Sequence, residues 1–169
     1  MTKSYTAIAT AIIGAPPAVV YNIIADYHHG HPLILPKPYF ISLSVEHGGF
    51  GAGTIINFEM KVAGKTQAFR AAISEPEPGR VLVETNLGDR GVVSTFLIEP
   101  RVGGQASAVT ITTEGVTERD GLAGSLERMM TTNYLQRIYK KELRLLDALA
   151  RERWSAAEAP QHRALPDKR

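Results

Sequence analysis

The sequence predicts an α+β domain in which a seven-stranded, curved antiparallel sheet wraps around one long C-terminal helix. Residues 39–113 contain short stretches of alternating apolar and polar residues, the pattern of half-buried strands. From Asp120 to Glu152, apolar residues instead recur every three or four positions without a proline, which is typical of one amphipathic helix. A sheet with one apolar face and a helix with one apolar side must bury both, and they do so against each other.

The N-terminal region predicts a first strand followed by two short helices. Residues 5–13 alternate and end at Gly14. Pro16 and Pro17 then stand where proline is tolerated, just inside a helix start, and the following apolar spacing predicts a helix to about Asp26. Residues 27–35 predict a second short helical or irregular segment, which ends at the prolines of "LPKP".

Six more strands are expected, and their short connections favour a consecutive antiparallel meander. The expected strands are 39–47, 56–62, 67–74, 81–87, 92–98 and 109–113, with "GDRG" as the turn of one hairpin. The whole domain is predicted to span residues 1–153. Residues 154–169, rich in Ala, Pro and charge, are expected to form a disordered tail.

Composition excludes several classes of function. The 169 residues include no cysteine, which rules out disulfides and thiolate chemistry and agrees with a cytoplasmic protein. The net charge of +2 without a basic cluster argues against nucleic acid as a partner. No apolar run is long enough for stable membrane insertion. "AGKT" at 63–66 lacks the first glycine of a phosphate-binding loop, because Glu59 occupies that position, and it lies in a strand–turn–strand context.

Three stretches carry a resemblance to a known family. They are "IIGAPPAVVYNIIADY", "VEHGGFGAGTIINFEM", and "FRAAISEPEPGRVLVETNLG" with "STFLIEP". In their order and spacing the chain resembles the START-like (SRPBCC) helix-grip superfamily, and within it the polyketide cyclase/dehydrase and lipid-transport group, over roughly residues 5–150. The resemblance implies a helix-grip fold with a hydrophobic cavity and no shared catalytic motif.

The main functional hypothesis is therefore binding of a small hydrophobic or amphipathic ligand (a lipid, quinone or polyketide-like molecule) between the sheet and the C-terminal helix. The alternative is a polyketide cyclase, aromatase or dehydratase that uses acid–base groups in the same cavity. A third hypothesis, a partner-binding module, would require an exposed apolar patch. No cofactor is expected, and the chain is expected to be a monomer or a homodimer.

Three histidines lie within four residues of "ADYHHGHPLILP". On a helix, His28 and His31 would share one face at i and i+3, while His29 would point elsewhere. Zinc needs a third ligand, and no motif supplies one, so no metal site is expected. The resemblance places this segment at the rim of the cavity, where His28 or His31 could act in acid–base chemistry.

Charged residues within strands are interpreted by the parity of their neighbours. Glu59 and Arg70 should face away from the helix and could pair with each other on the solvated side. The parity of Glu84 is open because Leu82 and Val83 are both apolar. An inward Glu84 would be a buried carboxyl that needs a partner, and hence a functional candidate.

The expected ligand-binding residues come from the inward strand positions and from the first half of the long helix. Two methionines, an asparagine and a tyrosine occupy that half where leucines would be usual, and they could line a cavity with Asn133 or Tyr134 as a polar anchor. The ligand-binding candidates are Phe58, Met60, Phe69, Phe96, Met129, Met130, Asn133 and Tyr134. The catalytic candidates are His28, His31, Glu84 and Tyr134.

Overall fold

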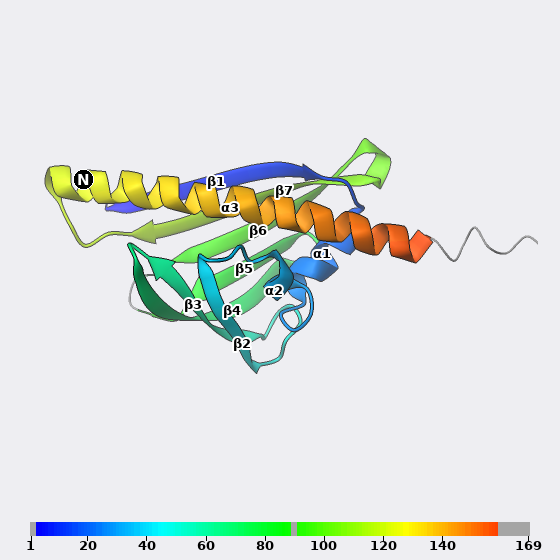
Figure 1. Ribbon diagram of the computed structural model, residues 1–169, viewed down its shortest axis with the longest axis horizontal. Coiled ribbons are helices and arrows are strands. Elements are labelled where there is room, and N and C mark those ends of the chain that lie inside the picture. Colours follow the sequence, from blue (N-terminus) through cyan, green and yellow to red (C-terminus); the bar gives the residue numbers. More distant parts are fainter. Residues whose placement is uncertain (1–2, 89–90, 159–169) are drawn as a thin grey trace, which may run out of the picture.

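A computed structural model describes residues 3–88 and 91–158. The elements follow the order β1 (Ser4–Ile13), α1 (Pro17–Ala25), α2 (His31–Ile34), β2 (Phe40–His47), β3 (Ile55–Val62), β4 (Lys65–Glu77), β5 (Val81–Asn86), β6 (Val93–Arg101), a single 3-10 turn (Val102–Gly104), β7 (Ala106–Val116) and α3 (Gly121–Glu158). The predicted helix-grip architecture is confirmed (Figure 1). The central two residues of the "GDRG" turn, 89–90, lie outside the described residues.

The seven strands form one antiparallel sheet in the order β1-β7-β6-β5-β4-β3-β2. From β2 to β7 this is the expected meander. The first strand departs from chain order and pairs with the last one along its whole length, from Ser4 opposite Val116 to Ile13 opposite Ser107. This pairing places β1 at one edge of the sheet and β2 at the other, and the N- and C-terminal parts of the domain become neighbours.

The long helix α3 runs beside β1 along the length of the molecule, and α1 and α2 pack against its C-terminal half (Figure 1). With 38 residues it is roughly 57 Å long at 1.5 Å per residue. It continues to Glu158, so residues 154–158 of the expected tail extend the helix, while residues 159–169 lie outside the described residues. No helix in residues 3–88 and 91–158 is long and apolar enough to cross a bilayer.

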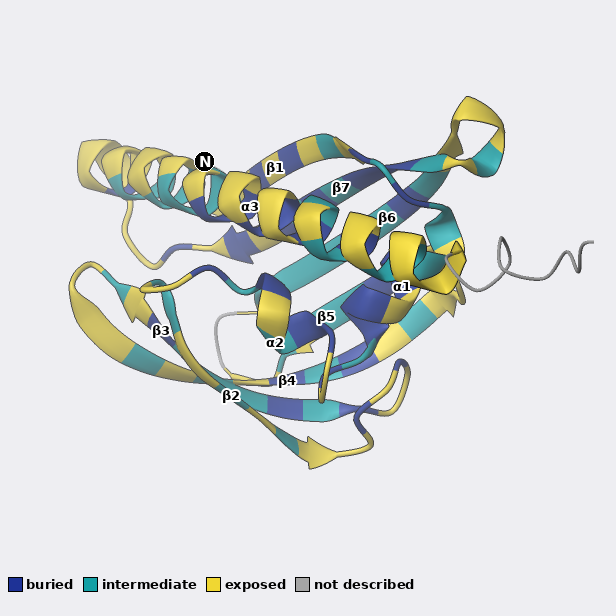
Figure 2. Cartoon of the chain, turned by 45° about the vertical axis from the view of Figure 1, so that its right-hand side comes forward, coloured by how far each residue is buried: buried dark blue, intermediate teal, exposed yellow. Residues whose placement is uncertain are grey.

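α3 packs tightly only from Ile138 onward. Apart from Gly124 in the first turn, the buried residues of the helix are Ile138, Tyr139, Glu142, Leu143, Leu146 and Ala150. Before Ile138 the buried stripe is thus almost absent, and the outer surface of these turns is exposed (Figure 2). The helix therefore seals one end of the sheet and leaves space beneath its first half.

Arg70 and Glu59 lie on the outer face of the sheet, as parity predicted. They do not pair with each other. Arg70 makes a two-pronged ion pair with Glu46 (2.6 and 2.8 Å), and Glu59 accepts a hydrogen bond of 2.8 Å from Ser42. Register explains the difference, because Arg70 lies opposite Asn57 and Glu59 lies opposite Ala68.

Candidate functional site

A cavity of about 240 Å³ lies between the inner face of the sheet and α3. Most of its wall is apolar, because inward positions of the strands and of α3 converge on it. Two aromatic contacts shape one side: Phe58 stacks on Phe69 with ring centroids 5.1 Å apart, and Phe40 lies 6.2 Å from Phe58. The other apolar lining residues include Leu35, Leu43, Ile56, Met60, Val62, Phe96, Ile111, Leu135 and Ile138.

Polar side chains gather at the end of the cavity where α2 and the second half of α3 meet the sheet. The polar lining residues there are His31, Glu84, Ser94, Thr113, Tyr139 and Glu142. Beside them, the buried Tyr27 donates a hydrogen bond of 2.6 Å to Glu84 Oε1. We call Tyr27 together with these six residues the inner polar cluster.

The geometry of His31 fixes one of its protons. The ring is 3% exposed and stacks on Tyr27 with centroids 4.6 Å apart. Its Nδ1 lies 2.8 Å from the carbonyl oxygen of Ile24, and since a carbonyl can only accept, Nδ1 carries the proton. Nε2 is therefore the atom that faces Glu84 Oε1, at 3.6 Å.

The hydroxyls on the other side of the cluster bond to each other. Tyr139 is hydrogen-bonded to Thr113, and Thr113 lies 2.7 Å from Ser94 Oγ. Burial raises the pKa of the Tyr139 phenol. Burial also raises the pKa of the Tyr27 phenol, and the negative charge of Glu84 adds to that shift. Both phenols are therefore fixed as neutral groups.

Glu142 differs from every other member of the cluster. Its side chain is 2% exposed, and its Oε1 has no hydrogen-bond partner among the described residues. Burial raises the pKa of the Glu142 carboxyl well above its ordinary value, and repulsion from Glu84 adds to the shift.

Most of the predicted strand residues line the cavity. Phe58, Met60, Phe69 and Phe96 do so as expected, and Glu84 points inward. Tyr134 also lines the cavity, but its hydroxyl donates to the backbone carbonyl of Lys61. The hydroxyl of Tyr134 is thus already engaged.

The helix candidates Met129, Met130 and Asn133 do not line the cavity, so that part of the prediction is wrong. Met129 and Met130 are 55% and 62% exposed, and Asn133 is exposed as well. The reason is the rotation of α3: the inward stripe runs through Glu127, Thr131, Leu135, Ile138 and Glu142. Together with Leu122 and Leu126, the two methionines instead form an exposed apolar strip.

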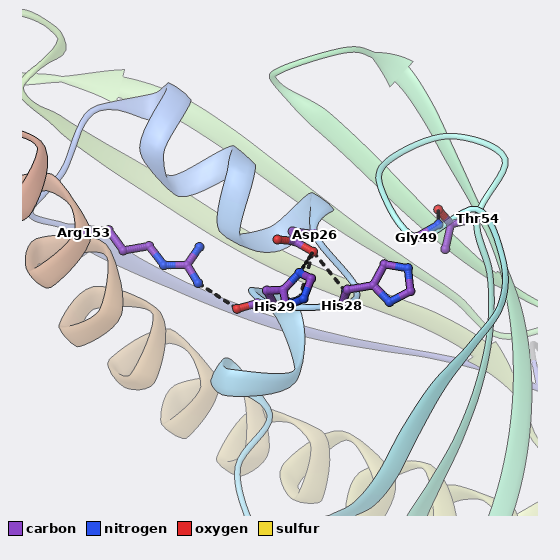
Figure 3. A network of polar contacts seen from close by, with 6 residues as sticks. All are labelled: Asp26, His28, His29, Gly49, Thr54 and Arg153. Atoms are coloured by element: carbon purple, nitrogen blue, oxygen red, sulfur yellow. Dashed lines mark hydrogen bonds and ion pairs between the residues drawn. The ribbon is translucent and has the colours of Figure 1, made fainter.

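The three histidines separate. His31 is buried at the cavity, whereas His28 and His29 are exposed. Figure 3 shows why the segment turns: Asp26 Oδ1 accepts the backbone N–H groups of both His28 and His29, each at 3.0 Å. His28 lies against the loop at Gly49, where an added Cβ would fall 2.1 Å from its Nε2. Among the described residues, no three side chains are placed to hold a metal ion.

With this geometry in place, comparison with known proteins decides the family. The model of the polyketide cyclase/dehydrase and lipid transport family matches residues 6–151. The chain belongs to this family. No curated protein matches it in sequence.

Solved structures share the fold of this polyketide cyclase/dehydrase family member. The KanY protein is 26% identical, with a TM-score of 0.74 over 88% of this chain and 98% of its own. The Zhui aromatase/cyclase from Streptomyces sp. R1128 is 17% identical (TM-score 0.72, 89% and 95% covered). A START superfamily protein from Mycobacterium smegmatis is 11% identical (TM-score 0.66, 88% and 98% covered).

Sequence reasoning identified two members of the inner polar cluster, His31 and Glu84, and missed the other five, which are Tyr27, Ser94, Thr113, Tyr139 and Glu142. The signal for Glu142 was present, because it stands four residues from both Ile138 and Leu146 in an otherwise apolar stripe. Tyr27 carried no such signal, since it follows α1 in a turn and its partner Glu84 lies 57 residues away.

Proposed function

We propose that this chain binds a small hydrophobic or amphipathic ligand, such as a lipid, a quinone or a polyketide-like molecule, in the cavity between the sheet and α3. The observation that carries the proposal is an apolar cavity of about 240 Å³ that ends in a buried polar cluster. The family's description, which joins polyketide chemistry and lipid transport, supports it.

Binding energy would come mainly from the apolar wall. Each Å² of ligand surface removed from water contributes roughly 25 cal/mol. Flat ligands suit the side formed by Phe58 and Phe69, because aromatic rings gain further from offset stacking. The inner polar cluster would orient the ligand's polar end.

Thermal-shift assays and native mass spectrometry with lipids, quinones and aromatic polyketides test the proposal. At least one apolar class should raise the melting temperature and bind one molecule per chain. Leu135→Trp, which fills the cavity, should weaken that binding by about tenfold or more, whereas Leu145→Trp on the exposed side of α3 should not. No shift with any class, or equal losses in both variants, would contradict binding in the cavity.

A second candidate function is a cyclase, aromatase or dehydratase reaction on a polyketone chain. The observation that favours it is the array Tyr27–Glu84–His31, in which a phenol, a carboxylate and an imidazole are linked at the cavity wall. Such groups can take a proton from a carbon beside a ketone and return one to a leaving hydroxyl. The cavity would hold the chain folded for ring closure.

Turnover of a polyketone substrate tests this candidate. Activity should depend on pH and be lost in His31→Ala and Glu84→Gln, whereas His28→Ala, which changes an exposed side chain, should retain it. Substrate binding without turnover at any pH would contradict the enzyme candidate and support ligand binding as the only function of the cavity.

The location and assembly of the chain are also proposals. The sequence contains no cysteine, which agrees with a reducing compartment, and we propose a cytoplasmic protein that is a monomer or a homodimer. Sedimentation of the purified chain and fractionation of its cells check both points.

A further inference from the structure

Glu142 occupies a position at which the helix would ordinarily place an apolar residue. It lies between Ile138 and Leu146 on the inward stripe of α3, its side chain is 2% exposed, and it lines the cavity. Its Oε1 has no hydrogen-bond partner among the described residues. A buried polar atom left unpaired is costly, so a carboxyl in this position calls for a partner that enters the cavity.

The neighbouring groups do not supply that partner. Glu84 on β5, His31 on α2, and Tyr27 and Tyr139 are the titratable groups of the inner polar cluster around Glu142. Tyr27 donates to Glu84, His31 Nδ1 donates to Ile24, and the Tyr139 hydroxyl bonds with Thr113.

No lysine or arginine is among the residues that line the cavity in the described part of the chain. An ionised Glu142 would therefore be a buried anion beside a second carboxyl, without a cation to pair with it. Burial and Glu84 both raise the pKa of Glu142, which favours the same protonated form. A protonated carboxyl carries one O–H donor, and a neutral buried acid plays this part in some enzymes that bind ketones.

We propose that Glu142 donates a hydrogen bond from its carboxyl O–H to a neutral carbonyl oxygen, that of a ketone or quinone, on an otherwise apolar ligand. This inference rests on the proposed function and adds the chemical class of the ligand. A hydrocarbon leaves the O–H without an acceptor. A carboxylate ligand brings a third acid next to Glu84 and Glu142 and must itself be stripped of water.

Three probes of one shape test the inference: 2-acetylnaphthalene (a neutral ketone), 2-ethylnaphthalene (a hydrocarbon) and 2-naphthoate (an anion). At pH 7 the ketone should bind about tenfold more tightly than the hydrocarbon, and the anion should bind weakest. In Glu142→Gln, which keeps an N–H donor of the same shape, the preference for the ketone should persist. In Glu142→Leu it should disappear, while the hydrocarbon still binds. Glu152→Gln, an exposed change on the same helix, is the control.

Infrared spectroscopy separates a direct hydrogen bond from a structural effect. The carbonyl stretch of bound 2-acetylnaphthalene should move to lower frequency in the wild type and in Glu142→Gln. This measurement does not need Glu142→Leu, so it tests the hydrogen bond even if that variant does not fold. Equal affinity for the ketone and the hydrocarbon, or an unshifted carbonyl stretch, would overturn the inference and leave cavity binding intact. Failure of all three probes to bind would overturn the inference and count against the proposed function itself.

Discussion

The phenol of Tyr27 donates a hydrogen bond of 2.6 Å to Glu84 Oε1, which joins the turn after α1 to the middle of the sheet. Tyr27 is only 1% exposed, and the side chain of Glu84 is 16% exposed. This contact gives the inward Glu84 the partner that a carboxyl in this place requires, and it holds the stacked ring of His31 at the cavity.

Removing that donor should destabilise the fold. Tyr27→Phe leaves Glu84 without its phenol partner, and we expect a loss of about 1–3 kcal/mol in the free energy of unfolding. Urea denaturation measures it. Tyr39→Phe is the matched control, because the Tyr39 hydroxyl only accepts a contact of 3.2 Å from Lys141 at the surface and its loss should cost little. Equal effects of the two changes would contradict this account of Glu84.

Stability should depend on the titration of Glu142. Its folded-state pKa is raised above the ordinary value of 4.5, so the folded state binds a proton more tightly than the unfolded state does. Its contribution to stability is complete below pH 4.5 and is lost as the pH rises through the folded-state pKa. Glu142→Gln removes this loss, so its stability relative to the wild type should increase from pH 4.5 upward. Urea unfolding of both proteins between pH 4 and 9 checks this, and a difference that is independent of pH would contradict it.

The two histidines that the sequence analysis could not separate should behave differently. His31→Ala removes a buried ring that stacks on Tyr27 and bonds to Ile24, and we expect it to cost more than about 2 kcal/mol. His28→Ala changes an exposed side chain and should stay within about 0.5 kcal/mol of the wild type. Thermal denaturation of both variants measures this contrast, and a larger loss in His28→Ala would refute it.

The outer face of the sheet offers an independent check on the strand register. Arg70, through its hydrogen bonds, lowers the pKa of Glu46 to about 2. Arg70→Leu should return that pKa toward 4.5, which carbon-detected NMR titration of the Glu46 carboxyl would follow. An unchanged pKa would mean that β2 and β4 do not bring these side chains together as the structure has them.

Alternation and helical spacing predicted the fold well, because the periodicity of apolar residues along a strand or helix indicates which of its faces is buried. Because Phe58 and Met60 alternate with the polar Glu59 on one strand, they were predicted to face inward, and they line the cavity. The pairing of β1 with β7 could not come from such local patterns, because it joins segments about a hundred residues apart.

The helix shows where local reasoning fails. The tightly packed second half of α3 fixes its rotation, and counting back from Ile138 in steps of three and four leads to Leu135, Thr131 and Glu127. Thr131 and Glu127 are polar, so this stripe could not be recognised from the spacing of apolar residues. The more apolar Met129 and Met130 instead indicated a different side of the helix. A helix that covers a cavity need not show its most apolar face to it, because no core fills the space beneath.

The methyl groups of methionine test the central claim, that the ligand binds in the cavity beneath α3, most directly. The chain has four methionines, of which Met60 lines the cavity, while Met129 and Met130 are exposed and do not line it. Methyl-labelled protein is titrated with 2-acetylnaphthalene, whose ring current shifts nearby resonances. We expect a large, saturable shift of the Met60 methyl with little change at Met129 and Met130. Shifts confined to Met129 and Met130 would contradict binding in the cavity.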